Sequence, residues 1–183
     1  EGADLTAAHF NNNDMTYANT LEASLPKSIE TLDRSIRDIL EDHLLWINSL
    51  GRKGKQAVLT EYDLQATDLA GINLQAAELS RTNLSNCTFL ASRLNMANME
   101  NVMALNSDFS DTDMRGAKLE KANLTGASLR HCRLSPMNIL GTQGSSVSSN
   151  LKNCCLDQAD LENANLSHAD LSGARIRFAN LTD

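Results

Sequence analysis

Several features that would indicate a metal site, a disulfide framework or a membrane span are missing from this 183-residue sequence. Its four cysteines follow neither a metal-ligand spacing nor a disulfide pattern. No apolar stretch is long enough to cross a bilayer. The chain has only two prolines, and aromatic residues make up 4% of it; scarce proline suits a fold that uses its backbone N–H groups for ladder hydrogen bonds. We therefore expect no metal, no cofactor and no membrane association.

Catalytic and nucleic-acid-binding arrangements are missing as well. The four histidines are scattered, and the Gly-Thr-Gln-Gly at 141–144 lacks the lysine of a phosphate-binding loop. The net charge is −7, and the basic residues on successive repeats are accompanied by acidic ones. This mixed set comprises Arg115, Lys118, Lys121, Arg130, Arg133, Asp111, Asp113 and Glu120. It is typical of a solvated face, so we expect no catalytic residues, no enzymatic activity and no nucleic-acid partner.

What the chain does contain is a five-residue repeat. From Leu59 to Ile139 every fifth position, which we call the centre, holds a large apolar residue, with Ala104 as the one exception. Two positions before the centre stands a mostly small residue, such as Ala57 or Cys87. This period matches neither an α-helix nor a strand. A short fixed period predicts a solenoid, because no single repeat can bury its own apolar side chain.

The repeat occurs in three frames, which define the expected domains. A short run over 1–25 is long enough for about one coil, and because the chain begins inside this run we expect a longer protein. The main run covers 57–183, with a change of frame between Ile139 and Leu151. The Gly- and Ser-rich segment 140–148 at this change is predicted to be a loop that leaves the solenoid wall.

The segment 26–56, between the first two runs, is predicted to be a cap and a linker. Its apolar residues recur at three- and four-residue steps from Ile29 to Leu50, which indicates one face of an amphipathic helix. We place this helix at 28–50, with Ser28 as its N-cap. Such a helix is long enough to cover the end of the solenoid.

Two residues of this helix, His43 and Trp46, are candidates for a ligand site because they lie three residues apart. A ligand or catalytic site would need a second histidine, a cysteine or a carboxylate cluster, and none lies nearby in the sequence. We therefore interpret both residues as part of the seam between the helix and the first coil.

The repeats resemble those of the pentapeptide-repeat family, whose unit is written A(D/N)LXX. The chain contains YDLQA, TDLAG, INLQA, AELSR and TNLSN over 62–86, and ADLEN, ANLSH and ADLSG over 159–173. The resemblance implies an all-β fold, a right-handed quadrilateral β-helix with four repeats per coil, to which the predicted α-helix near the N-terminus is added. Residues twenty apart in the sequence then lie one above the other.

That stacking makes specific predictions. Phe89 should stack on Phe109 inside the tube, and Arg93, Asp113 and Arg133 should form an outward column of alternating charge. The position before the centre often holds Asp or Asn, which we expect to hydrogen-bond the backbone of its own turn. Three cysteines, Cys87, Cys132 and Cys154, occupy the small inward position, whereas Cys155 should point outward. Unpaired thiols suit a reducing compartment, so we expect a cytoplasmic protein.

Five apolar residues stand at positions that should face outward and form the candidate interaction surface. They are Leu90, Met96, Met103, Leu105 and Phe178. Leu90 and Leu105 would lie on adjacent walls of consecutive coils, and an exposed apolar patch usually marks a contact. The alternative is that the helix folds back over this wall and buries it.

These observations predict a non-enzymatic protein-interaction scaffold with an unknown protein partner. The last coil would leave backbone groups open, so we expect either a homodimer through the C-terminal coil or a continuation of the chain that covers it. The alternative function comes from the resemblance, because some pentapeptide-repeat proteins mimic a DNA duplex and bind type II topoisomerases. Those proteins have strongly acidic walls, whereas 57–183 carries ten basic and fourteen acidic residues, a net charge of −4.

Overall fold

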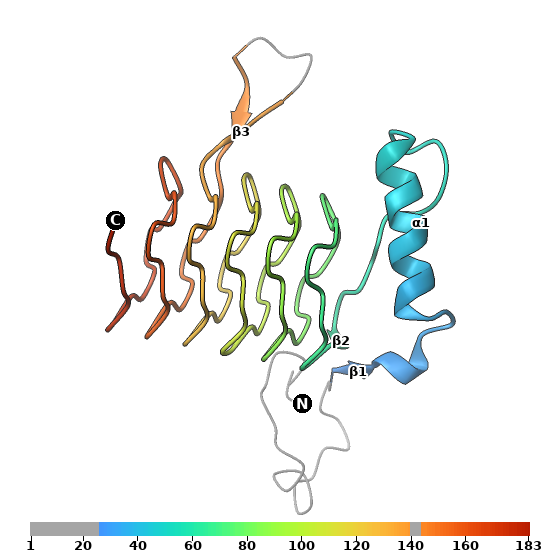
Figure 1. Ribbon diagram of the computed structural model, residues 1–183, viewed down its shortest axis with the longest axis horizontal. Helices are drawn as coiled ribbons and strands as arrows, with labels where there is room; N and C mark the ends of the chain where they lie inside the picture. Colours follow the sequence, from blue (N-terminus) through green and yellow to red (C-terminus); the bar gives the residue numbers. More distant parts are fainter. Residues whose placement is uncertain (1–25, 140–143) are drawn as a thin grey trace, which may run out of the picture.

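The computed structural model describes residues 26–139 and 144–183. Its regular elements are β1 (Lys27–Ser28), the 3-10 helix η1 (Ile29–Thr31), α1 (Ile36–Asn48), β2 (Tyr62–Asp63), β3 (Met137–Asn138) and β4 (Ser146–Val147). Most of the remaining chain winds in coils stacked along one axis, with α1 at one end and a hairpin projecting from the side (Figure 1). The predicted run over 1–25 lies outside the described residues.

Neighbouring coils are joined by parallel β-bridges between residues twenty positions apart. Asn83 pairs with Met103, for example, and Met103 pairs with Asn123. Across the described chain these bridges form four columns, so that four five-residue repeats complete one coil. Backbone hydrogen bonds accompany them, as where the N–H of Leu84 donates to the carbonyl of Met103 at 2.6 Å. The predicted stacking register is therefore present.

Each repeat turns the chain through a tight corner. The N–H of Thr67 donates to the carbonyl of Leu64, three residues earlier, at 3.1 Å. The third residue of this turn, Ala66, has a φ of 58°, which makes it a type II turn. The side chain of Asp63, just before the centre, accepts a hydrogen bond from the N–H of Gln65 at 3.1 Å. This geometry recurs in later repeats, so the corner role predicted for Asp and Asn is confirmed.

The interior of the coils holds the apolar centres. Phe89 and Phe109 are completely buried, and their rings stack with centroids 4.9 Å apart and planes 8° from parallel, as predicted. The small inward position has a role that the sequence did not reveal. From the second coil on, a hydroxyl group at this position donates to a carbonyl of the preceding coil, as from Thr112 to Phe89 at 2.8 Å. Ser and Thr can therefore replace Ala there without leaving a buried hydroxyl unpaired.

The predicted helix over 28–50 is shorter than expected. The α-helix begins only at Ile36, and its N-cap is Ser35, whose hydroxyl accepts from the N–H of Asp38 at 3.1 Å. Ser28 instead caps η1, because β1 pairs in parallel with β2 and holds Lys27–Ser28 in an extended conformation. The predicted capping role at the end of the tube is matched by packing, since Ile36, Ile39 and Leu40 contact the core of the first coil.

The predicted loop at 140–148 belongs to a hairpin that starts earlier. Strands β3 and β4 pair antiparallel, and the stacking resumes with Lys118 against Asn150, which are 32 residues apart instead of 20. Ile139, predicted as a centre, therefore lies in the hairpin, where its N–H donates to the carbonyl of Ser145 at 3.0 Å. The reason is Pro136, which falls on the corner position that needs a positive φ, whereas proline is fixed near −65°.

Candidate interaction surface

The five residues of the predicted surface lie in different environments. Phe178 is 89% exposed and Leu90 is 42% exposed, whereas Met96 and Leu105 are half-buried. Met103 is only 5% exposed and contributes nothing to the accessible surface, contrary to the prediction. Met103 stands just before a centre and is bridged to Asn83 of the preceding coil and to Asn123 of the following coil. Both neighbours lie at the spacing of adjacent strands, so they flank the Met103 side chain on two sides.

Met96 is partly covered by the base of the hairpin. A Cβ added at Gly116 would lie 2.7 Å from the sulfur of Met96 and 3.4 Å from the Cβ of Met137 in β3. Next to it, the side-chain amide of Asn95 contacts the sulfur of Met137 at 3.3 Å. The hairpin and the wall therefore share a small packed contact, and the hairpin base is anchored rather than free.

The helix does not cover the wall that carries Leu90 and Leu105. Figure 1 shows α1 standing across the end of the stack, against the first coil. A groove of about 450 Å³ remains between them, lined by Leu40 and Leu44 of α1 and by Leu69 and Ile72 of the coil. The proposal that the helix folds back over the predicted surface is therefore wrong, and Leu90 stays accessible.

His43 and Trp46 lie in the seam between α1 and the first coil, as interpreted from the sequence. The imidazole is fully buried and stacks on the indole with centroids 5.6 Å apart. Its Nδ1 accepts a hydrogen bond from the N–H of Ala57 at 3.0 Å, so His43 is neutral with its proton on Nε2. Burial lowers the pKa of His43, and the backbone of Gln75 opposes this shift. The seam therefore joins α1 to the first residue of the main repeat.

The last described coil presents apolar side chains to solvent. Its centres Ile176 and Leu181 are 45% and 53% exposed, whereas equivalent centres in the middle of the stack are fully buried. Phe178 lies on the corner after Ile176, with a φ of 59°. Together Ile176, Phe178 and Leu181 form an accessible apolar edge, which we call the terminal edge.

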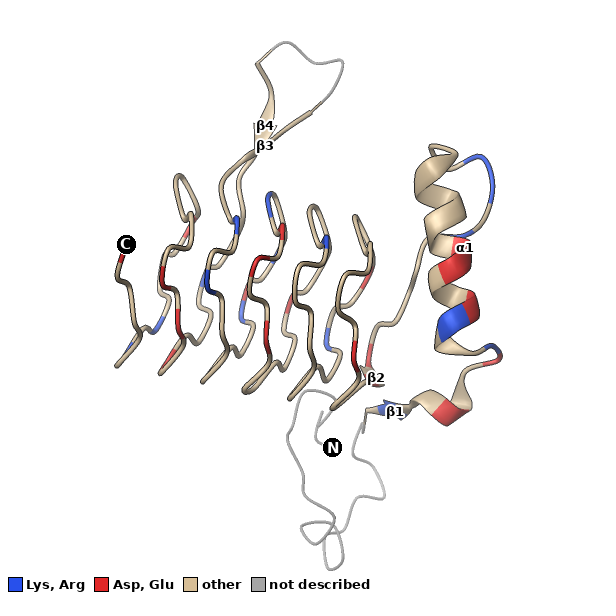
Figure 2. Ribbon diagram, viewed as in Figure 1, with Lys and Arg blue, Asp and Glu red and all other residues tan. Residues whose placement is uncertain are grey.

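Charged side chains of both signs are distributed along the walls (Figure 2). The column of Arg93, Asp113 and Arg133 has the predicted backbone register, but the ion pairs differ from the prediction. Asp113 binds Arg133 at 3.0 Å and Arg115 at 2.8 Å, and no ion pair of Arg93 is found within the described residues. Arg115 lies two residues after Asp113 in the same turn, where its guanidinium reaches both carboxylate oxygens.

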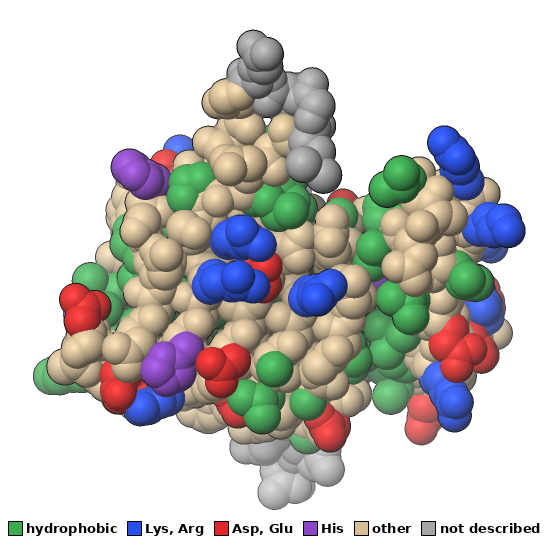
Figure 3. Space-filling view, turned by 45° about the horizontal axis from the view of Figure 1, so that its top comes forward, with side chains coloured by type: hydrophobic (Ala, Val, Ile, Leu, Met, Phe, Trp, Pro, Cys, Tyr) green, Lys and Arg blue, Asp and Glu red, His purple; other side chains and the backbone are tan. Residues whose placement is uncertain are grey.

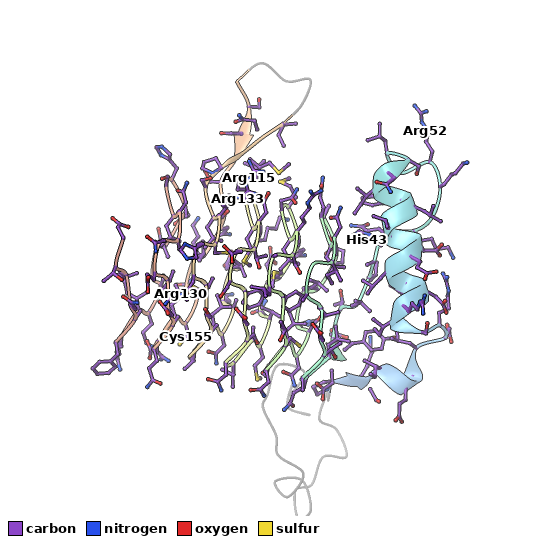
Figure 4. All side chains as sticks on the ribbon, in the orientation of Figure 1. His43, Arg52, Arg115, Arg130, Arg133 and Cys155 are labelled. Carbon is purple, nitrogen blue, oxygen red and sulfur yellow. The ribbon has the colours of Figure 1, made fainter. Side chains whose placement is uncertain are left out.

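The carboxylate of Asp113 is ionised in this cluster. Burial raises its pKa, but the hydrogen bonds from Arg115 and the charges of Arg115 and Arg133 outweigh that effect, so that the pKa lies below its usual range. Figure 4 shows Arg115 and Arg133 side by side beneath the hairpin. In contrast, Arg130 is paired with two carboxylates, Asp160 at 2.9 Å and Glu162 at 2.6 Å.

The thiols follow the prediction. Cys87, Cys132 and Cys154 are buried and unpaired, and burial raises the pKa of Cys87 to about 11 and that of Cys154 to about 12. Cys155 is half-buried and accepts a contact from Arg175 at 2.9 Å. Within the described residues no group of three His, Cys, Asp or Glu side chains could hold a metal ion. No helix of the described chain has both the length and the apolarity to cross a membrane.

A comparison with models of known protein families finds one family that matches this chain. The model of the family described as "Pentapeptide repeats" matches in eight copies over 67–103, 105–135 and 147–183, which is more than half of the chain. No curated protein sequence matches significantly.

Solved structures of the same family are also similar. A pentapeptide repeat protein from the cyanobacterium Cyanothece 51142 is 24% identical, with 66% of this chain and 87% of that chain covered and a TM-score of 0.44. HetL from Nostoc sp. strain PCC 7120, described as involved in heterocyst differentiation regulation, is 26% identical over 69% of this chain and 62% of its own, with a TM-score of 0.30. The plasmid-mediated fluoroquinolone resistance protein QnrB1 is 17% identical over 63% of this chain and 80% of its own, with a TM-score of 0.28.

Proposed function

Since the chain belongs to the pentapeptide-repeat family, we propose that it is a non-enzymatic protein-interaction scaffold, built as a right-handed quadrilateral β-helix. The observation that carries the proposal is the terminal edge, where Phe178 is 89% exposed on a corner of fixed backbone. A large apolar side chain in that position is costly in water and useful in a contact.

The first partner that we propose for this edge is a second copy of the chain. A two-fold contact would bury Ile176, Phe178 and Leu181 against the same residues of the other copy. Burying one Phe or Leu side chain contributes roughly 1.5–3 kcal/mol. We expect contacts among these three side chains of each copy to support a dimer.

Light scattering on three proteins tests this contact. The parent should be dimeric at micromolar concentration, and Phe178→Glu should be monomeric because it places a charge in the apolar contact. The matched control is His168→Glu, which changes another exposed corner residue of positive φ, at 56°, outside the terminal edge. A monomeric parent, or a dimer that survives Phe178→Glu, would refute self-association through this edge.

The alternative function, binding of a type II topoisomerase by DNA mimicry, rests on one structural feature, the hairpin that projects from the solenoid (Figure 1). The mixed charges of the walls favour the scaffold instead, because a DNA mimic needs a continuous acidic surface. A gyrase supercoiling assay separates the two functions. The scaffold predicts no effect of added protein, and inhibition or protection from a quinolone would establish the alternative.

The proposed compartment is the cytoplasm, on the evidence of the thiols. Three unpaired cysteines are buried inside the tube, and Cys155 is accessible at the surface. Free thiols of this kind persist where glutathione keeps cysteine reduced. Fractionation of the native cells, followed by detection of the protein in the soluble cytoplasmic fraction, tests this assignment.

A further inference from the structure

The arginine cluster beneath the hairpin is a surface of positive charge on an acidic protein. We propose that Arg93, Arg115 and Arg133 form a docking site for an acidic α-helix of a partner protein. The proposal deepens the scaffold function, because it names the chemistry of one partner. It is independent of the terminal edge and of self-association.

The charge balance of this cluster distinguishes it from the other arginines of the walls. Arg130 faces two carboxylates and is neutralised. Within the described residues, Asp113 is the only carboxylate that forms an ion pair with Arg93, Arg115 or Arg133, so these four side chains together carry a net charge of about +2. Figure 3 shows basic side chains gathered on this face below the hairpin, with an acidic side chain among them. The chain as a whole has a net charge of −7 and therefore repels acidic partners in general. A locally positive surface on such a chain favours a partner whose negative charges are clustered on one surface.

Asp113 holds two of the three guanidinium groups in position. It accepts from the Nε and Nη2 of Arg115 at 2.9 and 2.8 Å and from the Nη2 of Arg133 at 3.0 Å. A guanidinium has five N–H donors, so most donors of both arginines remain available for a ligand. The carboxylate itself is only 6% exposed, and its role is to orient the arginines. A partner then meets donors that are already ordered, which lowers the entropic cost of binding.

The spacing of the three arginines favours a helix over an extended peptide. They belong to three consecutive coils, because Arg93, Asp113 and Arg133 are bridged in series and Arg115 follows Asp113. Coils stack at about 4.8 Å, so the backbone positions of Arg93, Arg115 and Arg133 lie roughly 0, 5 and 10 Å along the axis. On an α-helix, residues i, i+3 or i+4, and i+7 share one face at about 5 and 10 Å. Same-face residues of an extended strand are about 6.7 and 13 Å apart, and this spacing does not match that of the arginines.

Fluorescence anisotropy with labelled peptides tests the site. The probe is an alanine- and glutamine-based helical peptide with Glu at i, i+4 and i+7, and its partner peptide has the same composition with the Glu residues spread around the helix. At about 0.1 M salt, the parent protein should bind the aligned peptide at least tenfold more tightly than the spread one. Arg93→Gln/Arg133→Gln should lose at least tenfold in affinity for the aligned peptide. This variant keeps Arg115, so Asp113 is not left without a partner.

The matched control is Arg52→Gln/Lys53→Gln, which removes the same charge from the exposed loop after α1, at the α1 end of the stack (Figure 4). It should bind the aligned peptide within about twofold of the parent. Equal affinity for the two peptides, equal losses in the two variants, or tighter binding of duplex DNA than of the aligned peptide would each overturn the proposal. These outcomes are separate from the scaffold test, because a parent that fails to dimerise can still bind the peptide.

Discussion

The conformational strain of the tight turn in each five-residue repeat is located at the corner residue. Most corners of the described chain place a residue other than glycine at a φ near +55 to +60°, as in Ala91, Asp111 and Lys121. A left-handed conformation costs an L-residue roughly 1–2 kcal/mol. The cost is tolerated because ladder hydrogen bonds on both sides over-determine the backbone. Asn and Asp recur at these corners since their side chains tolerate this region best.

His131 offers a direct test of corner strain. Its φ is 56°, it is exposed, and no side-chain hydrogen bond of His131 occurs within the described residues. Replacement by glycine removes the strain but adds freedom to the unfolded chain, so His131→Gly should raise the free energy of unfolding by about 0.5–1 kcal/mol. His131→Val should lower it, because β-branched residues adopt positive φ least readily. Urea unfolding measures both, and equal stabilities of the two variants would show that the corner is unstrained.

At the scale of single elements, α1 depends on a histidine that must be neutral. Protonation of His43 would place a charge in a buried seam and would replace the Nδ1 acceptor of the Ala57 N–H by a donor. Because burial lowers the folded pKa of His43 below the usual 6.5, the unfolded chain binds the proton first as the pH falls. The contribution of this seam to stability is therefore complete above about pH 6.5 and is lost as the pH falls below it.

Urea unfolding between pH 5 and 8 measures this dependence. The parent should become less stable from about pH 6.5 downward, and His43→Phe should lose that part of the slope while keeping a ring against Trp46. The matched control, His168→Gln, removes an imidazole from an exposed corner and should keep the parent slope. A parent whose stability is constant across this range would show that the seam does not titrate.

The sequence predicted the repeated elements better than the interruptions. The period, the stacking of Phe89 on Phe109 and the corner role of Asp and Asn all follow from rules that act identically in every repeat. The start of α1 and the extent of the hairpin instead depend on individual residues and contacts that are not repeated along the chain. Ser35 competed with Ser28 as an N-cap, and pairing of β1 with β2 decided between them. Pro136 did indicate that the repeats end there, since proline cannot occupy a corner. Ile139 nevertheless fits the five-residue spacing of the apolar centres, and it was therefore predicted to be one of them.

The same distinction applies to the candidate surface. Whether a residue points outward was predictable from its place in the repeat, but its exposure was not, because exposure depends on the neighbours twenty residues away and on the hairpin. Met103 is buried between its column neighbours, and Met96 is half-buried, with its sulfur and Met137 of β3 both close to Gly116. The pairing of Arg115 with Asp113 was missed for a related reason, since it joins two positions of one turn rather than one column.

The hairpin is predicted to be an insertion that the solenoid can lose. Removing residues 136–147 joins Ser135 to Ser148 and restores a five-residue step from Leu134 to Leu151, with Ser149 at the small inward position. Ser149 already donates to the carbonyl of Met114 at 3.1 Å, so its inward place is kept. The shortened protein should unfold cooperatively with a midpoint close to that of the parent. Removing 136–148 instead leaves a four-residue step, and this control should be strongly destabilised.

At the scale of the whole molecule, stability is distributed as in other stacked arrays, where each coil is held by its neighbours. A middle coil has a ladder on both sides, as where the N–H of Leu124 donates to the carbonyl of Cys155 at 2.7 Å and the N–H of Asn123 donates to the carbonyl of Val102 at 2.8 Å. The first coil is covered by α1, whereas the last described coil has one neighbour and half-exposed centres. The two ends of the described stack therefore differ in what protects them.

Native-state hydrogen exchange should reveal this asymmetry as a gradient along the axis. The amides of Leu84, Phe89 and Leu124, in buried ladders of inner coils, should exchange only through global unfolding. The amides of Arg175 and Asn180, which donate back to Cys154 and Ala159 at 2.9 Å, should exchange through opening of the last coil at a much lower free energy. If the protein dimerises through the terminal edge, raising its concentration should slow exchange at Arg175 and Asn180 and leave Leu84 unchanged. Uniform protection from Leu84 to Asn180 at low concentration would show that the coils unfold as one unit, and that the terminal edge is not a weak point that a partner needs to cover.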